Sequence, residues 1–436
     1  MSTHTYYRLT LEAVSPVSVG SGSDSNTDHD CIRHRNGSPF IPASTVAGVF
    51  RHGFSGSAAL ERKLFGTIEG VSSASSIIFY DCEPVGKYSF SVRDGVRLRN
   101  KVAVDKAKFD IEVVETGARF VTYIELDKDG SEYKDIVDGL ISGLDNGLLR
   151  FGHKTSRGYG IMKVTEKKEI SFDLDSPEEL EKWLSFDMFA DSSWAGVEAT
   201  DTRKLTGDSC LIHLSLRQRG AVTIRVYTTD LSLEQKAAVK AKQSYTNETL
   251  RDSDDLVHAP DYKHITLSDG TPVIPGTSWA GAFRARFAQL MGESGEEAVK
   301  SLFGIVEEDE AAHKTITKPS RIFFSESKIK KGTFTPKLIT RNSIDRFSSK
   351  TKDSALYKEY TCYGGDTELD IVVPADISER EKFCLSTAIY DLSQGYLAVG
   401  GLTTVGHGLF SVTGMTVNGE DKTGSLVPEK LMEMWR

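Results

Sequence analysis

The stretch FIPASTVAGVFRHGF, residues 40–54, is nearly repeated as VIPGTSWAGAFRARF, residues 273–287. The two stretches align without a gap and keep the same order of apolar and polar positions. A near-repeat at such a distance within one chain is the sequence signature of a duplicated domain. Matches on both sides of the two stretches decide whether the whole domain is repeated.

Further matches follow in the same order in both copies. RLTLEAVSPVSV (8–19) aligns with HLSLRQRGAVTI (213–224), LFG recurs at 64–66 and 302–304, IIFYD (77–81) resembles RIFFS (321–325), RLRNKVAVDKAK (97–108) resembles LITRNSIDRFSSK (338–350), and GHKTSRGYG (152–160) resembles GGLTTVGHG (400–408). Ordered matches of this kind indicate two copies of one domain. The second copy is longer because it has an insertion between Arg225 and Asp261.

Length and charge divide the chain in the same way. We expect a first domain at residues 1–166, an acidic linker at 167–207 and a second domain at 208–436 with an insertion near 226–260. The net charge is −9, and residues 169–201 alone hold ten acidic residues and one basic residue. The acidic excess therefore belongs to the linker, and it does not exclude a nucleic-acid partner for the two domains.

Each copy contains a basic segment at the same place. Lys87 to Lys108 holds seven basic and two acidic residues, and Lys328 to Lys352 holds eight basic residues and one acidic residue. A single run of charge is usually only a solvated face, but recurrence in both copies favours a binding surface for nucleic acid.

The pattern of apolar residues predicts an α+β fold. Residues 5–14 alternate as a half-buried strand, with Tyr7, Leu9 and Leu11 on one face. Residues 44–54 have the period of a helix that begins at a Ser44 cap, and Thr277 takes that place in the second copy. We expect helices on one face of an antiparallel sheet in each domain, with a long basic loop before the second helix.

The five cysteines are widely spread and show no spacing typical of a zinc site, so we expect reduced thiols. The N-terminus lacks the pattern of a secretory signal, and no apolar run is long enough to cross a membrane. These features predict a cytoplasmic protein without a membrane partner.

Two features of each copy suit phosphate groups. The helix that begins at Ser44 or Thr277 would present free backbone amides, and Arg51 or Arg284 follows two turns later. The glycine-rich segment of the first copy adds two cations, a hydroxyl group and an aromatic ring at Lys154, Ser156, Arg157 and Tyr159. A capped helix with a surface arginine and a tight glycine turn remain the alternatives, and the second copy has Leu402 and Val405 in place of the cations.

These motifs together resemble the RAMP superfamily of CRISPR systems, most closely the backbone subunit of type III effector complexes, here as a tandem fusion. The resemblance covers most of both copies and rests on GSG at 20–22, the IPASTVAGVFR helix entry, the RNSIDR segment and GHKTSRGYG. It implies ferredoxin-like domains related to the RNA recognition motif, with thumb-like hairpins that kink a guide–target duplex. The residues of the basic hairpin segments that we expect to bind RNA are Arg99, Asn100, Lys101, Arg341, Asn342 and Arg346.

The resemblance also implies a cleaving aspartate in the loop before the helix entry, which falls on Asp28 and Asp261. Asp28 precedes Ile41 by the same number of residues as Asp261 precedes Ile274, so both carboxylates take the same place in the fold. A carboxylate there could hold Mg²⁺ or another divalent cation, or help to remove the proton of a ribose 2′-OH. Asp30 competes with Asp28, and Asp254 and Asp255 compete with Asp261. Basic or histidine neighbours accompany both, namely His29, Arg33, His34, Arg35, Lys263 and His264.

Two functions from different classes follow. The chain is either a guide-RNA-dependent endoribonuclease subunit that cuts complementary target RNA at two sites, or a non-catalytic scaffold that binds guide RNA. In both cases the expected partners are crRNA, single-stranded target RNA and other CRISPR effector subunits. An enzyme that matures the precursor guide is a third alternative, which the tandem repeat disfavours.

Overall fold

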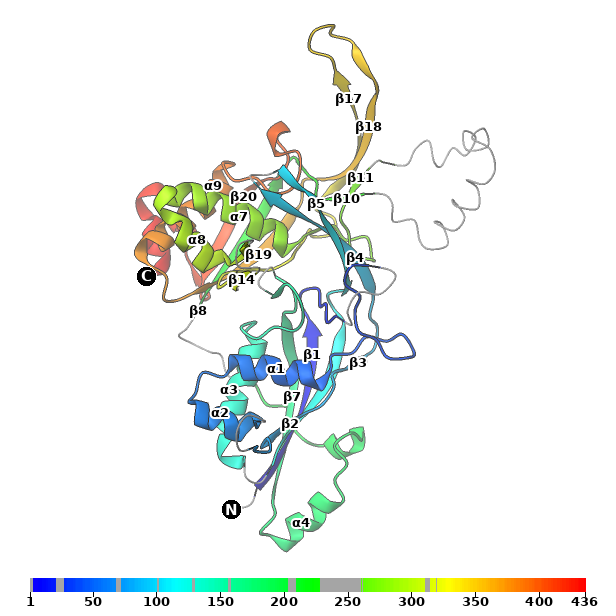
Figure 1. Ribbon diagram of the computed structural model, residues 1–436, viewed down its shortest axis with the longest axis vertical. Helices are drawn as coiled ribbons and strands as arrows, with labels where there is room; N and C mark the ends of the chain where they lie inside the picture. The colour runs from blue at the N-terminus through cyan, green and yellow to red at the C-terminus, as the bar shows by residue number, and fades with distance from the viewer. Residues whose placement is uncertain are drawn as a thin grey trace, which may run out of the picture. The chain divides into compact units, whose positions relative to one another are not determined.

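The computed structural model describes residues 3–20, 27–67, 72–99, 102–127, 130–155, 158–202, 209–227, 260, 262–309, 314–318 and 320–436. The chain divides into two compact units, Met1–Ser209 and Cys210–Arg436 (Figure 1). Each unit has its own sheet, helices and apolar core.

The sheet of the first unit has the strand order of a ferredoxin-like fold. Its strands are β1 (Thr3–Ala13), β2 (Ile77–Phe79), β3 (Glu83–Val85), β6 (Arg119–Leu126) and β7 (Met162–Asp173). The order is β2-β6-β1-β7, with β3 also paired to β6, and β1 runs antiparallel to both of its neighbours. Helices α1 (Ala43–Gly53) and α3 (Lys134–Asp145) are the two crossovers of a β-α-β-β-α-β unit. The predicted α+β fold class is confirmed.

The apolar face of β1 forms the centre of the first core. Tyr7, Leu9 and Leu11 are fully buried, as the alternating pattern predicts. Val46 and Phe50 of α1 pack in the same cluster, which confirms the apolar stripe expected for that helix.

The acidic segment covers part of the opposite face of this sheet. Residues 167–173 lie in β7, and the chain continues into α4 (Pro177–Leu184) and a short 3-10 helix, η3 (Asp191–Trp194). Tyr6 points away from Tyr7 because side chains alternate along a strand, and its ring packs with Phe172 and Trp194. The Trp183 indole Nε1 donates a hydrogen bond to the Tyr6 hydroxyl at 2.9 Å. The described part of the segment expected as a linker thus packs on the first unit.

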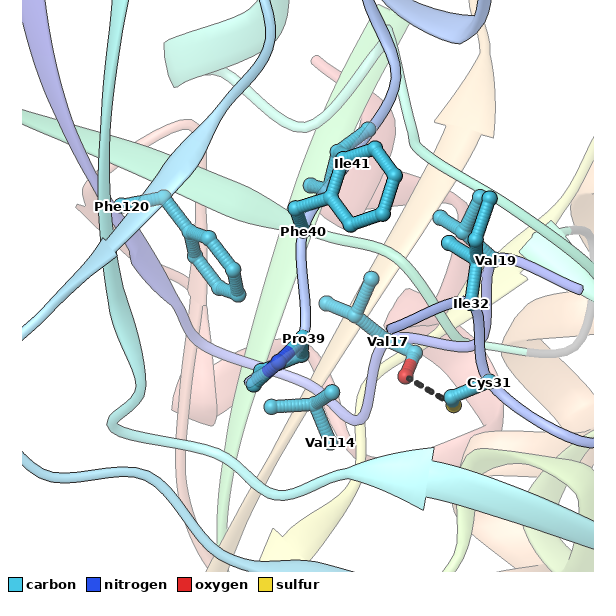
Figure 2. Close-up of a pocket in the computed structure, with 9 residues that line it drawn as sticks. All are labelled: Val17, Val19, Cys31, Ile32, Pro39, Phe40, Ile41, Val114 and Phe120. Carbon is cyan, nitrogen blue, oxygen red and sulfur yellow. Dashed lines mark hydrogen bonds between the residues drawn. The ribbon is translucent and has the colours of Figure 1, made fainter. Parts of the chain in front are cut away.

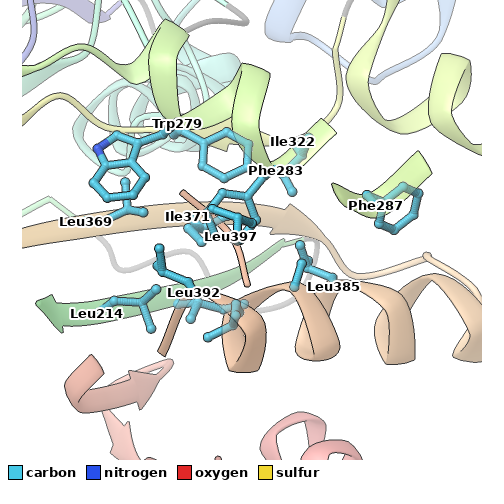
Figure 3. Packing of buried hydrophobic residues seen from close by; sticks show 14 of the residues in the cluster. Leu214, Trp279, Phe283, Phe287, Ile322, Leu369, Ile371, Leu385, Leu392 and Leu397 are labelled. Atoms are coloured by element: carbon cyan, nitrogen blue, oxygen red, sulfur yellow. The ribbon is translucent and has the colours of Figure 1, made fainter. Parts of the chain in front are cut away.

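The second unit repeats the same topology. Its sheet consists of β8 (Ser209–Arg219), β15 (Phe323–Phe324), β19 (Asp366–Pro374), β20 (Leu409–Val417) and β21 (Glu420–Asp421), in the order β15-β19-β8-β20-β21. Its crossover helices are α7 (Gly276–Met291), followed by α8 (Glu296–Phe303), and α9 (Glu379–Gln394). Figure 3 shows Trp279 and Phe283 of α7 pointing toward Leu369 and Ile371 of β19, so helix and sheet share one apolar core.

The ends of several helices have local sequence causes. The Ser378 side chain accepts a hydrogen bond from the backbone of Glu381, whose own side chain bonds back to the Ser378 amide, and this capping box starts α9. Ser57 caps α2 (Ala58–Phe65) in the first unit. The other described elements are β9 (Ala221–Val222), β10 (Arg225–Tyr227), β11 (Tyr262–His264), β12 (Val273–Ile274), β13 (Ile305–Asp309), β14 (Lys314–Lys318), β16 (Ser327–Lys328), η1 (Ser131–Tyr133), η4 (Glu293–Gly295), η5 (Thr403–Val405), η6 (Thr423–Ser425) and η7 (Pro428–Trp435).

The basic segment is a β-hairpin in both units, so the loop assignment made from the apolar pattern is wrong and the hairpin that the resemblance implied is present. The first hairpin pairs β4 (Phe90–Arg99) with β5 (Val102–Val114), and the second pairs β17 (Thr335–Ile344) with β18 (Thr351–Tyr363). Each hairpin is inserted between the second and third strands of the ferredoxin-like order. Residues that alternate in charge and apolarity, such as KVAVDKAKFDIEV, suit two paired strands better than a loop.

The alignment of the two RN pairs is also wrong at the level of structure. Arg99 pairs with Val102 at the tip of its hairpin, whereas Arg341 pairs with Tyr357, several residues before the tip. The second hairpin is longer at its end because residues 345–350 form its turn. The aligned residues Arg99 and Arg341 therefore lie at different distances from the tips of their hairpins.

The predicted caps Ser44 and Thr277 are not caps. Helix α1 begins at Ala43 after Pro42, α7 begins at Gly276 after Pro275, and neither helix has a side-chain cap. Pro42 and Pro275 flank the helices with extended ψ angles of 143° and 144°, and a proline there has no amide hydrogen to satisfy. Ser44 and Thr277 lie one residue inside their helices.

All five cysteines are free thiols, as expected. Within the described residues, no helix combines the length and the apolar character needed to cross a membrane.

Candidate nucleic-acid interface

Three segments meet beside the hairpin of the first unit. Backbone bonds join Val17 to Val114, at the end of β5, and His29 forms a parallel bridge with Ile111 of the same strand. The glycine-rich segment joins them because the His153 amide donates to the Ser18 carbonyl at 2.8 Å. The loop that carries Asp28 is thus held against the base of the basic hairpin.

Asp28 is fixed by a reciprocal pair of hydrogen bonds. Its Oδ2 atom accepts from the Asp110 amide at 3.0 Å, and Asp110 Oδ1 accepts from the Asp28 amide at 2.8 Å. Asp28 is exposed, whereas its competitor Asp30 is buried and accepts a 2.6 Å hydrogen bond from the Thr27 hydroxyl. Of the two carboxylates, Asp28 is the one that a ligand in solvent can reach.

Two histidines lie next to this position. The rings of His29 and His153 are 5.7 Å apart between centroids. Burial lowers the pKa of His153, and the nearby His29 and Lys154 lower it further. His153 lies inside the glycine-rich motif that the repeat marks, but no sequence pattern indicates that its ring lies beside His29.

Two more of the basic neighbours of Asp28, Arg33 and His34, already have partners. Arg33 forms a 2.5 Å ion pair with Glu112 and stacks on the Phe90 ring, and His34 pairs with Glu83 at 2.9 Å. These pairs tie the loop to the hairpin and the sheet.

An apolar pocket underlies the same loop. Figure 2 shows Cys31 and Val17 at this pocket, with the Cys31 thiol 3.9 Å from the Val17 carbonyl. Burial, with a smaller effect of Glu112, raises the pKa of Cys31 to about 12, so the thiol stays protonated and unreactive. The pocket is lined by Val17, Val19, Cys31, Ile32, Pro39, Phe40, Ile41, Val114 and Phe120. It anchors the loop through apolar contacts.

The glycine-rich segment is a tight turn with a specific need for glycine. Gly160 has a φ of +77°, and a Cβ atom there would lie 2.0 Å from the Phe151 carbonyl oxygen. Lys154 extends over the Phe109 ring, with Nζ 3.3 Å from the centroid. Tyr159 is buried, so its ring packs inside the unit and cannot stack on a base as predicted. Ser156 and Arg157 lie outside the described residues.

The helix-entry residues do not form the predicted phosphate site in the first unit. The Asp81 carboxylate accepts a 2.6 Å hydrogen bond from the Ala43 amide, so an acidic side chain already occupies the start of α1. Arg51 pairs with Glu61 of α2 at 2.7 Å instead of facing that end. In the second unit, Arg284 donates to the Gly304 carbonyl at 3.0 Å. RNA binding by Ser44, Thr277 and the two arginines stays a prediction without support from this geometry.

The second unit aligns with the first by its backbone bonds. Val222 pairs with Cys362 as Val17 pairs with Val114, and the Gly401 amide donates to the Thr223 carbonyl at 2.8 Å. Tyr262 pairs in parallel with Glu359, as His29 does with Ile111. By this register, the positions of His29, His153 and Lys154 are taken by Tyr262, Gly401 and Leu402. Asp261 itself lies outside the described residues, as do Asp254, Asp255 and most of the insertion.

A buried polar cluster stands at the base of the second hairpin. Glu359 is completely buried, and its Oε1 atom accepts a hydrogen bond from the Thr223 hydroxyl. Arg341 Nη2 donates to His407 Nε2 at 2.8 Å, and Arg341 Nε lies 3.3 Å from Glu359 Oε2. Burial lowers the pKa of His407, and the effect of Glu359 in the opposite direction is offset by Arg341 and Arg225. No sequence pattern indicated this cluster.

Two of the predicted RNA-binding residues lie on the open surface of the second hairpin. Asn342 and Arg346 are exposed on the second hairpin, and the Phe347 side chain at its turn is 85% exposed. Arg341 is half-buried in the cluster described above. Arg99 ends β4, and Asn100 and Lys101 lie outside the described residues. Exposed cations and rings on one hairpin suit a sugar-phosphate chain with unstacked bases.

The residues around Asp28 could hold a divalent cation only if phosphate oxygens of bound RNA supplied the other ligands. In the described part of the chain, no three His, Cys, Asp or Glu side chains converge as a metal site. Mg²⁺ needs only one or two protein carboxylates where phosphate oxygens complete its coordination. The exposed carboxylate of Asp28, with that of Asp110 beside it, fits this limited requirement.

Comparisons with known proteins identify the family. No curated protein matches the chain. A solved structure titled "Type III-B Cmr-beta Cryo-EM structure of the Apo state" contains a similar chain with 14% sequence identity and a TM-score of 0.31, and the match covers 36% of this chain and 96% of that one. The sequence profile of the RAMP superfamily matches residues 10–163 and again residues 257–411. The two matches include most of the chain and fall one in each unit, so the protein belongs to the RAMP superfamily as two copies of its domain.

Proposed function

We propose that the chain is a guide-RNA-binding backbone subunit of a type III CRISPR effector complex and that it cleaves complementary target RNA. Membership in the RAMP superfamily and the motifs of both copies support this assignment. The expected partners are crRNA, single-stranded target RNA and other effector subunits, in the cytoplasm. Asp28 is the proposed cleaving residue of the first unit, and Asp261 is its counterpart in the second.

One observation carries the proposal. The exposed carboxylate of Asp28 is held at the base of a basic hairpin by its bond from the Asp110 amide. An RNA strand that follows the hairpin would pass this carboxylate. A rigid acid beside a bound phosphodiester has the placement that a cleavage reaction needs.

The chemistry requires little more than alignment and charge control. The ribose 2′-oxygen attacks the adjacent phosphorus, a new O2′–P bond forms, and the P–O5′ bond breaks. Asp28 would accept the 2′-OH proton or hold a divalent cation, and the 5′-oxygen takes a proton from water. Such a cation, Mg²⁺ for example, would neutralise charge on the phosphate. His29 and Lys154 lie beside the site and would favour binding of the phosphate.

The non-catalytic scaffold is the second candidate, and one observation favours it for the second unit. Tyr262, Gly401 and Leu402 replace the two histidines and the lysine that surround the Asp28 position in the first unit. A unit without these groups could bind guide RNA and leave target RNA intact.

The test uses the effector complex assembled with guide RNA and given labelled complementary RNA with Mg²⁺. We expect cuts at two positions, separated by the length of guide that one unit covers. Asp28→Asn should abolish one cut, Asp261→Asn the other, and the double variant should still bind target. If both single variants still cut the target RNA at both positions, the nuclease assignment is wrong. If the parent chain binds guide RNA but leaves the target RNA intact, the chain is a scaffold.

A further inference from the structure

The second unit has a charged cluster where the first unit has an apolar one. In the first unit, Ile111, Val113 and Tyr159 are buried together. The backbone register places Glu359, Thr361 and His407 at these three positions in the second unit. The first unit has cations nearby, since Arg93 is buried opposite Ile111 and Lys154 lies over the Phe109 ring, but it has no carboxylate or histidine at the three positions themselves.

The buried carboxylate restrains one arginine. A carboxylate removed from water is costly unless it is paired and hydrogen-bonded. Glu359 accepts from Thr223 and lies 3.3 Å from Arg341 Nε, so the guanidinium neutralises the buried charge. Arg341 also donates to His407 Nε2, which fixes its plane from a second direction. A guanidinium has five N–H donors, so these contacts leave others for a ligand, and the Arg341 side chain is 26% exposed.

A second arginine lies in the same cluster. Arg225 stacks on the Tyr262 ring at 4.2 Å, and its Nη2 atom donates a 3.5 Å hydrogen bond to the Tyr262 hydroxyl. Its Nε atom, like that of Arg341, is buried with no hydrogen-bond partner among the described residues. The Nε atom of Arg225 lies 3.7 Å from the position that a Cβ atom would take at Gly401, which is an ordinary contact distance, so the guanidinium borders the glycine-rich turn. Arg225 stacks on Tyr262, whose backbone pairs with Glu359, the ion-pair partner of Arg341, so both arginines lie by the same buried carboxylate.

Among the residues that the structure describes, the charges of the cluster do not balance. His407 accepts a hydrogen bond at Nε2 and is therefore neutral, so within this described set two guanidinium groups accompany one carboxylate, that of Glu359. A surplus positive charge in a partly buried place attracts an anion strongly because water screens it poorly. Paired guanidinium groups match the oxygens of a phosphate in both charge and shape.

We propose that Arg225 and Arg341 together bind one backbone phosphate of RNA in the second unit, and that Glu359 is the positioning residue of Arg341. The inference rests on the proposed RNA-binding function and names the group of the RNA that this unit holds. The first unit lacks arginine at both positions, because Gly20 and Gly95 stand there by the backbone register.

The experiment measures the affinity of the full chain for guide-length single-stranded RNA over a series of KCl concentrations. Arg225→Gln and Arg341→Gln should each weaken binding by roughly tenfold, as expected for a lost charged hydrogen bond. The plot of log affinity against log salt should lose about 0.7 of slope in the double variant, the value for a single phosphate on single-stranded nucleic acid. The same measurement is made with guide RNA alone and with a guide–target duplex. If the variants lose affinity for guide RNA alone, the phosphate belongs to the guide. If they lose affinity only for the duplex, the phosphate belongs to the target.

Two further variants test the positioning role. Glu359→Gln removes a negative charge, so electrostatics alone would strengthen RNA binding, whereas loss of the Arg341 orientation would weaken it. We expect weakening by about fivefold at an unchanged salt slope, because the arginines keep their charges. Arg341→Lys also keeps the charge but lacks the planar fork, and it should behave in the same way. Arg341→Lys keeps the test decisive if thermal unfolding shows that Glu359→Gln does not fold.

Arg217→Gln is the matched control, because Arg217 is an exposed arginine of the same unit that pairs with Asp366 outside the cluster. It should leave affinity and slope nearly unchanged. If Arg225→Gln and Arg341→Gln behave like Arg217→Gln while the parent chain binds RNA, this inference is wrong and the proposed function stands. If the parent chain binds no guide RNA, the proposed function fails and this inference fails with it.

Discussion

The Nε2 atom of His153 lies 2.8 Å from the position that a Cβ atom would take at Gly20. The second unit has the reverse arrangement, with the large side chain of Arg225 facing Gly401. The glycine makes room for the long side chain in the first unit, whereas a Cβ atom at Gly401 would lie at an ordinary contact distance of 3.7 Å from Arg225. This exchange gives the first unit a histidine beside Asp28 and the second unit an arginine beside Tyr262.

The exchange predicts strong coupling between positions 20 and 153. Gly20→Arg alone should destabilise the chain by about 1–3 kcal/mol because the side chain must displace His153. His153→Gly combined with Gly20→Arg should recover at least about 1 kcal/mol of that loss in a double-mutant cycle. Urea unfolding of the four proteins measures the coupling. Additive losses would show that the two side chains do not compete for one space.

Asp28 and Asp30 should respond differently to the same substitution. Asp28→Ala removes the acceptor of the Asp110 amide at an exposed place, so it should cost about 1 kcal/mol of stability and abolish one cut in target RNA. Asp30→Ala removes a buried acceptor of the Thr27 hydroxyl, so it should cost as much or more and leave both cuts. Unfolding and cleavage assays on the two variants separate the roles. If Asp30→Ala loses one cut in target RNA while Asp28→Ala keeps both cuts, the cleaving residue is Asp30 and not Asp28.

The closing turns of the two units should be equally sensitive to a methyl group. Gly160 and Gly408 have φ values of +77° and +76°, and a Cβ atom would lie 2.0 Å and 1.9 Å from the carbonyl oxygens of Phe151 and Val399. Alanine at either position should cost more than about 2 kcal/mol because both strain and contact oppose it. Gly281 in α7 is the control, since nothing lies within 4 Å of its Cβ position, and Gly281→Ala should stabilise by up to about 1 kcal/mol. A tolerated alanine at position 160 or 408 would contradict the described turn.

Stability should fall in mildly acid solution because of His264. Burial lowers the pKa of this residue in the folded chain from 6.5 to about 4, against the weaker effect of backbone hydrogen bonds. Below pH 6.5 the unfolded chain takes up a proton that the folded chain refuses, so the stabilising effect is complete above pH 6.5 and is lost as the pH falls to about 4. The free energy of unfolding should decrease by about 2 kcal/mol between pH 7 and pH 5 from this residue alone.

The comparison of parent and His264→Gln by urea unfolding at both pH values isolates that contribution. The variant should show a flatter dependence on pH, and His52→Gln, at an exposed position, should keep the dependence of the parent. An equally steep dependence in His264→Gln would assign the acid sensitivity to other groups.

The repeat in the sequence was sufficient to predict two domains of one α+β fold. Alternation in residues 5–14 and the stripe of Val46 and Phe50 depend only on local periodicity, and both faces are buried as predicted. The glycines at 152–160 and 400–408 align because their turns have the same backbone requirement. Local patterns of this kind survive duplication, so one chain displays them twice.

The sequence alone determined the duplicated fold, the basic segments and the place of Asp28, because each of these depends on neighbours along the chain. Only the tertiary structure decided what lies around these places. Hydrogen bonds and packing between distant segments bring Asp110 to Asp28, His153 to His29, and Arg341 to Glu359. The same contacts place the Asp81 carboxylate at the start of α1 and bury the Tyr159 side chain. Contacts across such distances follow from the strand order and register of the folded unit, which no local pattern of residues specifies.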